Sequence, residues 1–153
     1  MNANGTMNAN GKTFVATEPG DTLETRAVSG PDIRLPNGAR VDVKMAIVNL
    51  ATGATTEIIP AVTTARLMIV GLVLTAGAAG VATVTIKSAA TAISPLLSLP
   101  TNGSLVLPLN PGGYMRPDAV NEAINGTVTG AAVGCIAHYI EVPVDVDWPG
   151  VTL

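Results

Sequence analysis

Aromatic and charged residues are both scarce in this chain of 153 residues, and cysteine and histidine occur once each. Aromatic residues make up 3% and charged residues 12%, about half the charged share of an ordinary globular protein. The single cysteine, Cys135, excludes an internal disulfide, and with one histidine it leaves no ligand set for a structural zinc. The net charge of −3 provides no basic surface of the kind that nucleic acids bind, so we expect no nucleic-acid partner.

The familiar motifs of catalysis are also missing from the sequence. It contains no phosphate-binding loop, dinucleotide glycine motif or zinc-protease helix motif, and no serine lies in a Gly-x-Ser-x-Gly frame. His138 shares a predicted strand face with Ile136 and Ile140, which favours a core or interface role because no oriented acid–base partner is nearby. Cys135 on the opposite face is predicted to be a small buried thiol. We therefore expect a protein that is not an enzyme and that carries no cofactor.

Three acidic residues near the C-terminus, Glu141, Asp145 and Asp147, are a candidate calcium site. Their spacing does not match a calcium-binding EF-hand loop, and isolated carboxylates are usually solvated. We therefore predict no metal site.

A sugar site is the other candidate, with Asp118 and Glu122 close to Tyr114 and Arg116. Sugar sites usually present aromatic platforms, and the chain has few residues to build one. The aromatic residues are Phe14, Tyr114, Tyr139 and Trp148. A turn followed by the start of a strand is the simpler prediction for this stretch.

The segment from Arg66 to Lys87 holds about twenty uncharged residues, a length that could span a bilayer as a helix. Its middle is rich in Gly, Ala and Thr, and its second half alternates between apolar and polar residues, which is typical of a strand. We predict two strands joined as a hairpin by the turn at residues 75–80, where Gly77 and Gly80 allow positive φ. Because Leu67–Leu74 is apolar at nearly every position, we expect that strand to be covered on both faces, and we predict no membrane partner.

About nine short strands, separated by turn signals every 8–12 residues, predict an all-β fold with no helix. In the strand at 41–48, we expect Val41, Val43, Met45 and Ile47 to face the core. Pro60 predicts an edge position or a bulge for the strand at 55–62. A single β-sandwich is the expected architecture, with a jelly roll as its favoured version. Further strands are expected at 13–16, 23–28, 92–99, 104–109 (Leu105, Leu107 and Leu109 inward), 120–128 and 134–142.

Three regions are expected along the chain. Residues 1–39 form an extended N-terminal arm with loops and short strands, starting with the polar repeat MNANG-T-MNANG. Residues 40–143 form the sandwich, and residues 144–153 form a short C-terminal tail. The polar start shows no apolar signal segment, so we expect folding in a cytosol.

Several of these stretches together resemble a small virion domain that is common in tailed phages. They are Ile58–Ala61, Arg66–Leu74, Ala82–Ser88, Leu105–Leu109, Asn110–Tyr114, Glu122–Ile124 and Gly134–Val142. They lie within the segment from Ile58 to Val142, which makes up a little over half of the chain. Arg116-Pro117 departs from the pattern, since a Thr-containing stretch before a Gly is expected there.

The resemblance implies a capsid decoration or cement protein, of the kind also found as modules of head fibres. It implies a jelly roll or related sandwich that associates as a homo-oligomer, a trimer, on the outer surface of the virion, after synthesis in the cytoplasm of the bacterial host. The partner that it implies is the major capsid protein, contacted through a terminal arm. It transfers no catalytic residue.

The low charge and the surplus of apolar strand faces favour a binding role for this chain. The candidate interface residues are Phe14, Arg26, Arg34, Leu67, Ile69, Tyr114 and Trp148. The alternative is a host-recognition module of a fibre or spike that binds surface glycans, with Tyr114 or Trp148 at the base of a pocket.

Overall fold

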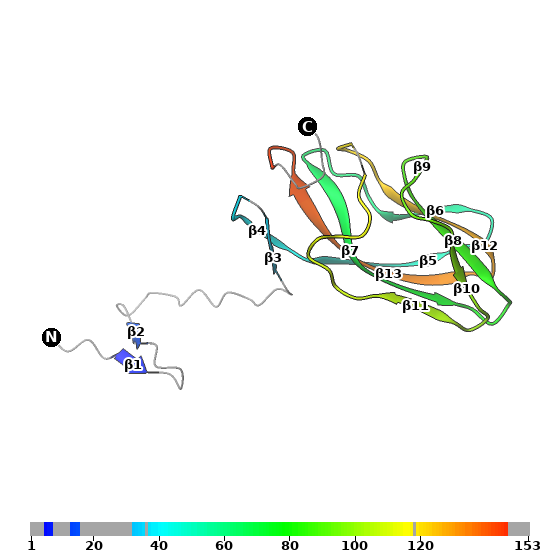
Figure 1. Ribbon diagram of the computed structural model, residues 1–153, viewed down its shortest axis with the longest axis horizontal. Helices are drawn as coiled ribbons and strands as arrows, with labels where there is room; N and C mark the ends of the chain where they lie inside the picture. The colour runs from blue at the N-terminus through cyan, green and yellow to red at the C-terminus, as the bar shows by residue number, and fades with distance from the viewer. Residues whose placement is uncertain (1–4, 8–12, 16–31, 36, 118, 147–153) are drawn as a thin grey trace.

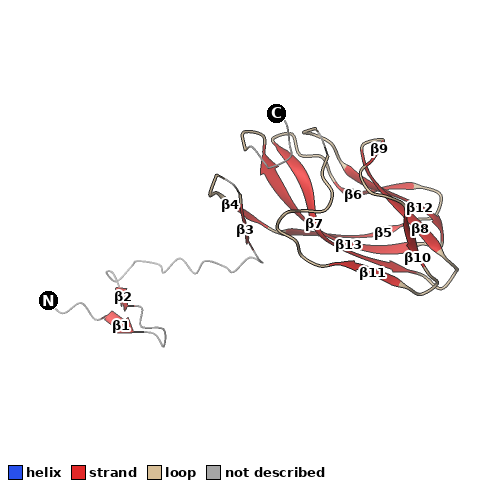
Figure 2. Ribbon diagram, viewed as in Figure 1, coloured by secondary structure: helices blue, strands red, loops and turns tan. Residues whose placement is uncertain are grey.

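The computed structural model describes residues 5–7, 13–15, 32–35, 37–117 and 119–146, and within these residues every regular element is a strand (Figure 2). Two antiparallel sheets dominate the fold (Figure 1). We call them the β7 sheet and the β8 sheet. The β7 sheet has the order β11 (Ser104–Leu107), β7 (Ala65–Ala76), β13 (Val133–Pro143), β5 (Lys44–Leu50). The β8 sheet has the order β10 (Leu97–Leu99), β8 (Ala82–Ser88), β12 (Ile124–Gly130), β6 (Thr55–Ile59), and β9 (Thr91–Ala92) also pairs with β8.

Two short ribbons complete the described strands. β3 (Asp32–Arg34) pairs with β4 (Arg40–Asp42), and β1 (Gly5–Met7) pairs with β2 (Thr13–Val15). The sequence-based prediction of an all-β sandwich is confirmed. The strand predicted at 23–28 lies outside the described residues.

The strand pairs are nested around the connection between β8 and β10. β8 pairs with β10, β7 with β11, β6 with β12 and β5 with β13, each time antiparallel. Two further antiparallel pairs, β12 with β8 and β13 with β7, join these four pairs into the two sheets. The chain passes from one sheet to the other at nearly every connection, so strands that are distant in sequence become neighbours.

A hydrophobic core fills the space between the two sheets. β8 shows how alternation builds it, because Ala82, Val84 and Ile86 are fully buried while the residues between them are only half-buried. This is the pattern that the sequence predicts for a strand with one face on the core. Leu72 and Leu74 of β7 lie opposite and are likewise fully buried in the same cluster.

From Leu67 to Leu72, β7 is buried on both of its faces, as its continuous apolar sequence predicts, whereas Val73 is only half-buried and Thr75 is exposed. The pairing register with β13 shifts next to Gly71, because His138 pairs with Gly71 and Tyr139 pairs with Ile69. Val70 is therefore a bulge residue without a partner on β13, and the alternation of inward and outward side chains along β7 changes at this point. Before the shift, Leu67 and Ile69 point into the sandwich core. Met68 and Val70 point to the outer side and belong to a second apolar cluster.

The second cluster is built by the chain itself. Ile33 and Leu35, at and just after β3, and Val146, after β13, are buried in it against Ile140 and Val142 of β13. The segment around β3 and the residues that follow β13 therefore cover one end of the outer side of the β7 sheet.

The segment from Arg66 to Lys87 forms two strands, as predicted, but they do not form a hairpin. β7 and β8 belong to opposite sheets, and the turn at residues 77–81 carries the chain across the edge of the sandwich. Of the two glycines, only Gly80 has a positive φ, at 142°. The prediction of a hairpin was wrong because turn residues indicate where a chain reverses and not whether the strands pair. No helix among the described residues is long and apolar enough to cross a membrane.

The predicted facing of β5 was also wrong. Val41 and Val43 pack against the second cluster on the outer side, and Met45 and Ile47 are 58% and 69% exposed. The core instead receives the alternate set, of which Leu50 is fully buried. Both alternate sets of β5 contain apolar residues, so a period of two could not tell which set faces inward.

Prolines end or interrupt strands as expected. β6 ends at Ile59, next to Pro60, and it is an edge strand of its sheet. Pro95 lies in the break between β9 and β10. β11 ends before Pro108, so Leu109 is 43% exposed and does not point inward as predicted.

Candidate binding surface

Beyond the second cluster, the outer side of the β7 sheet is apolar and uncovered by the described residues. A row of β-branched residues crosses all four strands, with Val106 opposite Val73, Val73 opposite Ile136, and Ile136 opposite Ile47. The two ends of the row, Val106 and Ile47, are 60% and 69% exposed. We call this surface the aliphatic face, and its members are Met45, Ile47, Val73, Val106, Ile136 and His138.

His138 lies in the neighbouring row of the aliphatic face, opposite Met45 on one side and Gly71 on the other. A Cβ at Gly71 would lie 3.4 Å from the Cβ and Nδ1 of His138, so a glycine there leaves room for the imidazole. The side chain is half-buried on an otherwise apolar surface. A contact role for His138 therefore stays a prediction.

Cys135 points the other way from β13, into the sandwich core, where it is 1% exposed. Burial disfavours the thiolate and raises the pKa of the thiol from 9.0 to about 12. The prediction of a small buried thiol is confirmed. Since Cys135 and His138 lie on opposite sides of their strand, they cannot act as a nucleophile–base pair.

A shallow hollow of about 300 Å³ lies at the end of the aliphatic face, where β7 and β13 reach their turns. It is lined by Asn49, Thr75, Ala76, Gly77, Ala132, Val133 and Gly134. Gly134 lies opposite both Asn49 and Thr75. Because Gly134 has no side chain, the surface is depressed at this position of β13. The hollow makes the surface uneven at its polar border.

The outer side of the β8 sheet has the opposite chemistry. Thr83 lies opposite Thr129, and Thr85 lies opposite Thr127, and the Thr83 and Thr129 hydroxyl groups are hydrogen-bonded to each other. Ser98 lies opposite Thr83 on the other side. We call this surface the hydroxyl face, and its members are Thr83, Thr85, Ser98, Thr127 and Thr129.

Two of the candidate interface residues are buried and expose almost no surface. Leu67 and Ile69 are 2% and 0% exposed, and both lie in the core between the sheets. An interface role for these two side chains does not fit the structure, because β7 is already covered on both sides by its own chain. Arg34 is exposed on β3, opposite Arg40 of β4.

The other candidates are only partly described. Arg26 and Trp148 lie outside the described residues, and Phe14 is placed in β2 without a description of its side chain. Their interface roles stay predictions.

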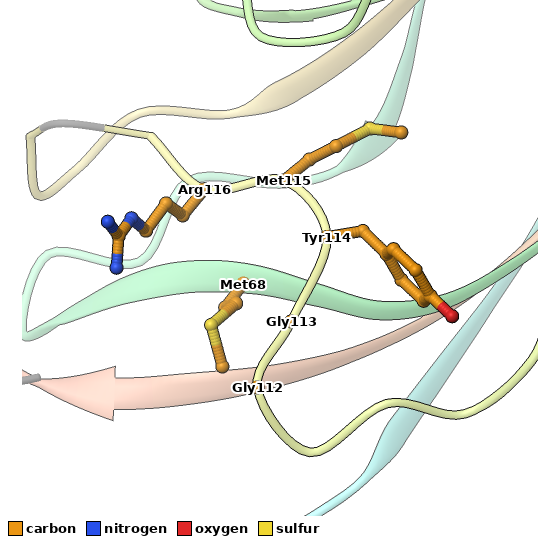
Figure 3. A pocket seen from close by; sticks show the side chains of 6 residues that line it. All are labelled: Met68, Gly112, Gly113, Tyr114, Met115 and Arg116. Carbon is orange, nitrogen blue, oxygen red and sulfur yellow. The ribbon is translucent and has the colours of Figure 1, made fainter. Parts of the chain in front are cut away.

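Tyr114 lies in the loop between β11 and β12 and is 38% exposed. Its hydroxyl donates a hydrogen bond to the Pro108 carbonyl oxygen at 2.8 Å, and its amide donates one to the Ile69 carbonyl oxygen at 2.8 Å. The bond to Ile69 holds the loop against β7, and the bond to Pro108 joins two parts of the loop. A pocket of about 270 Å³ beside this loop is lined by Met68, Gly112, Gly113, Tyr114, Met115 and Arg116 (Figure 3).

The pocket lacks the arrangement expected of a sugar site. Figure 3 shows the Tyr114 ring and the Arg116 guanidinium pointing to opposite sides of the loop, so they do not converge on one ligand. Glu122 accepts a hydrogen bond from the buried Ser88 hydroxyl and is not among the lining residues. Asp118 lies outside the described residues.

The acidic residues near the C-terminus do not gather around a cation site. Glu141 forms an ion pair with Lys44, with 2.6 Å between Oε1 and Nζ, and this contact raises the pKa of Lys44 above its usual value. Asp145 is exposed, and Asp147 lies outside the described residues. Among the residues that the structure describes, no group of three or more metal-ligating side chains comes together.

The structure is an all-β sandwich whose most distinctive feature is the exposed aliphatic face. Comparison with models of known protein families, with curated proteins and with solved structures finds no match to this chain. The function is therefore argued from the residues themselves. What the aliphatic face can do chemically is to bind another apolar surface by excluding water.

Sequence reasoning missed most of the aliphatic face. Met45 and Ile47 were assigned to the core, and Val106 lies between the two leucines expected to point inward. One signal was available, since β5 has apolar residues in both alternate sets of positions, which is unusual for an edge strand with one solvated side. Only the pairing of β5 with β13 shows which set faces out.

Proposed function

We propose that this protein is a structural protein of a phage virion, a capsid decoration or cement protein that binds the major capsid protein and its own copies. The aliphatic face carries the proposal. It displays large apolar side chains on the outer side of a sheet that is already well packed on its inner side. Contiguous exposed apolar surface of this kind marks an interaction site more often than a solvated one.

The chemistry of the aliphatic face suits a permanent, non-covalent contact. Five of its six members, all except His138, have side chains without an ionisable group. Burial of apolar surface stabilises a contact by about 25 cal/mol for each Å² removed from water. A protein that attaches to the outside of a capsid needs only such a contact, and no catalytic group takes part.

The size of the face indicates that one copy binds weakly. Four strands about 4.8 Å apart, over about five residues each, cover roughly 300 Å². A stable interface buries about 800 Å² on each partner. Attachment therefore needs several copies acting together, which is the arrangement expected of a decoration protein that associates as a homo-oligomer.

The nested strand pairs favour a jelly roll as the finer description of the sandwich. Counted from β5 and omitting the short β9, eight strands pair first with last, second with seventh, third with sixth and fourth with fifth. An eight-stranded chain folded in this way forms two interlocked Greek keys, which is the jelly roll known from viral capsid and lectin domains.

Binding to capsids tests the proposal. Purified protein is mixed with undecorated particles and the bound fraction is measured by co-sedimentation. Val106→Lys places a charge on the aliphatic face and is expected to reduce binding about tenfold or more, because a lysine buried without a partner is costly. Thr85→Lys on the hydroxyl face is the matched control and should bind like the natural chain. Equal binding by both variants would show that the aliphatic face is not the contact.

A glycan-binding module of a fibre or spike is the second candidate, and the half-exposed Tyr114 beside a pocket is the observation that favours it. Glycan-array binding that is lost in Tyr114→Ala but kept in Val106→Lys would support this alternative. Electron microscopy of intact particles separates the two, because decoration places the protein on the head and host recognition places it on the tail.

A further inference from the structure

The sandwich has four edge strands, and three of them carry features that block pairing with another strand. β10 has three residues and lies between Pro95 and Pro100. β6 contains Glu57 and ends next to Pro60, and β11 has four residues and is followed by Pro108. Short strands, prolines and charges are the usual means by which proteins prevent edge-to-edge association.

β5 lacks these protections. It has seven residues without proline, and in the described part of the chain it pairs only with β13. Its one charged residue is Lys44 at the first position, and the Lys44 ammonium is held by Glu141 at 2.6 Å. A long edge strand with a single charge at its first position and exposed apolar side chains is a template for a further strand.

The inward side chains of β5 also lack full cover. Ala46 and Val48 are half-buried, although their partners on β13, Ala137 and Cys135, are 0% and 1% exposed. The apolar core therefore reaches the margin of the β7 sheet and ends there without a covering strand among the described residues. An additional strand beside β5 would complete this burial.

We propose that β5 pairs with β5 of a second copy of this chain, antiparallel and around a two-fold axis at Ile47, which is the middle residue of the strand. This inference rests on the self-association included in the proposed function and names the contact that produces it. A two-fold contact uses the same surface on both copies. It gives a dimer in place of the trimer that the resemblance implies.

Charge and side-chain matching favour a second copy as the occupant. In this register Ile47 faces Ile47 of the partner subunit, and Met45 faces Asn49 of the partner subunit. Lys44 faces Leu50 of the partner subunit, so no like charges meet. The first residue of β5 in one copy can therefore lie opposite the last residue of β5 in the other copy without charge repulsion.

The dimer would enlarge the aliphatic face. The row from Val106 through Val73 and Ile136 to Ile47 would continue across the axis into the same row of the partner, over eight strands. The area available to a capsid would double to roughly 600 Å², close to the roughly 800 Å² that a stable interface buries on each side. Edge pairing thus supplies the combined surface that one copy lacks.

Analytical ultracentrifugation of the purified chain over a range of concentrations tests the contact without capsids. The natural chain is expected to be a monomer–dimer system. Ile47→Lys is expected to raise the dissociation constant about tenfold, since identical charges then face each other across the axis. Val106→Lys is the matched control, because it puts the same charge on the same row at a similarly exposed position far from the axis, and it should dimerise normally.

Charge exchange makes the test independent of any loss of folding. Ile47→Lys and Ile47→Glu should each dimerise poorly, whereas an equimolar mixture should form a mixed dimer, because opposite charges then meet at the axis. Three outcomes would overturn the inference. The natural chain could be a monomer or a trimer, its dimer could be unaffected by Ile47→Lys, or the mixture of the two charged variants could fail to form dimers. An equal loss of dimerisation in Val106→Lys would also overturn the inference, because it would indicate that the aliphatic faces of two copies pack against each other. If the dimer is found and capsids are not bound, only the proposed function fails.

Discussion

The two outer surfaces of this sandwich follow the same alternation of side chains and have opposite chemistry. On the β8 sheet, Thr85 and Thr127 face each other in the hydroxyl face, which suits strands that lie against water. On the β7 sheet, Ile136 and Ile47 face each other in the aliphatic face. The core between the sheets explains the inner residues of both sheets equally well. It does not explain the outer residues of the β7 sheet.

This difference supports the proposal that the aliphatic face binds a partner. Threonine would preserve the β-branched shape and the strand preference at Val106 or Ile47, and the hydroxyl face shows that this fold accepts it. Retaining aliphatic side chains at exposed positions is useful when a partner removes them from water. The predictions below test this comparison, beginning with the largest expected effect.

The largest expected effect is a difference in thiol reactivity between the inner and the outer side of β13. Cys135 is buried and its pKa is raised to about 12, so a thiol reagent at pH 8 should reach it only through opening of the sandwich. A cysteine introduced next to it on the aliphatic face, in Ile136→Cys with Cys135→Ala, should react about a thousandfold faster, because opening a stable domain costs several kcal/mol. Stopped-flow labelling measures both rates, and similar rates would contradict the assigned facing of β13.

The raised pKa of Cys135 also predicts a dependence of stability on pH. Because the folded thiol ionises near 12 and the unfolded thiol near 9.0, the contribution of the buried neutral thiol is complete below pH 9. It should be lost as the pH rises from 9 toward 12. In Cys135→Ala, denaturant titrations should show a smaller loss of stability over this range.

Neighbouring residues of β7 should differ sharply in their contribution to stability. Leu72 is fully buried between the sheets, so Leu72→Ala is expected to lower the free energy of unfolding by about 2–5 kcal/mol. Val73 points to the aliphatic face and is half-buried, so Val73→Ala should cost less than about 1 kcal/mol. Urea titration of the two variants measures the difference, and equal losses would mean that the two sides of β7 are wrongly assigned.

Converting the aliphatic face into a hydroxyl face should remove binding without removing the fold. The double variant Val106→Thr and Ile47→Thr should keep its free energy of unfolding within about 1 kcal/mol, since both positions are exposed. Its affinity for capsids should fall about tenfold, a loss of about 1.4 kcal/mol. The reciprocal control, Thr85→Val with Thr127→Val on the hydroxyl face, should leave capsid binding unchanged. A loss of binding in this control would contradict the claim that only the aliphatic face contacts the capsid.

The ion pair between Lys44 and Glu141 should have the smallest effect. The Lys44 side chain is 47% exposed, so Glu141→Gln is expected to cost at most about 1 kcal/mol at neutral pH. The contact raises the pKa of Lys44, so its contribution is complete below the ordinary lysine pKa of 10.5 and is lost as the pH rises through the raised value. Thermal unfolding of the natural chain and of Glu141→Gln should therefore converge at high pH, and a constant difference would contradict the pair.

Much of the fold could be predicted from the sequence, because alternation and turn residues are local signals. The strand at 82–88, its inward residues, and the double cover of β7 from Leu67 to Leu72 follow from periodicity and composition, whereas the expected cover over Val73 is not complete. Which strands pair is a non-local property, so the passage of the chain between sheets after Ala76 could not be predicted. The extra residue at Val70, which changes the facing of β7, also depends on the pairing with β13.

The candidate site was harder to predict than the fold. Leu67 and Ile69 were chosen as contacts because they are apolar, and the second cluster and the core already occupy both sides of their strand. Met45 and Ile47 were assigned to the core for the same reason. Composition identifies a surplus of apolar side chains, but only the packing shows which of them are left exposed.

Oxidation of Met45 is the most direct test that the aliphatic face is covered in the assembled particle. Met45 is 58% exposed on this face, whereas Met68 and Met115 are buried, so dilute peroxide should oxidise Met45 before Met68 and Met115 in the free chain. Mass spectrometry of peptides from particle-bound protein should show Met45 protected, while Met68 and Met115 keep the slow rates of the free chain. Oxidation of Met45 at the same rate in the free and the particle-bound protein would contradict the account.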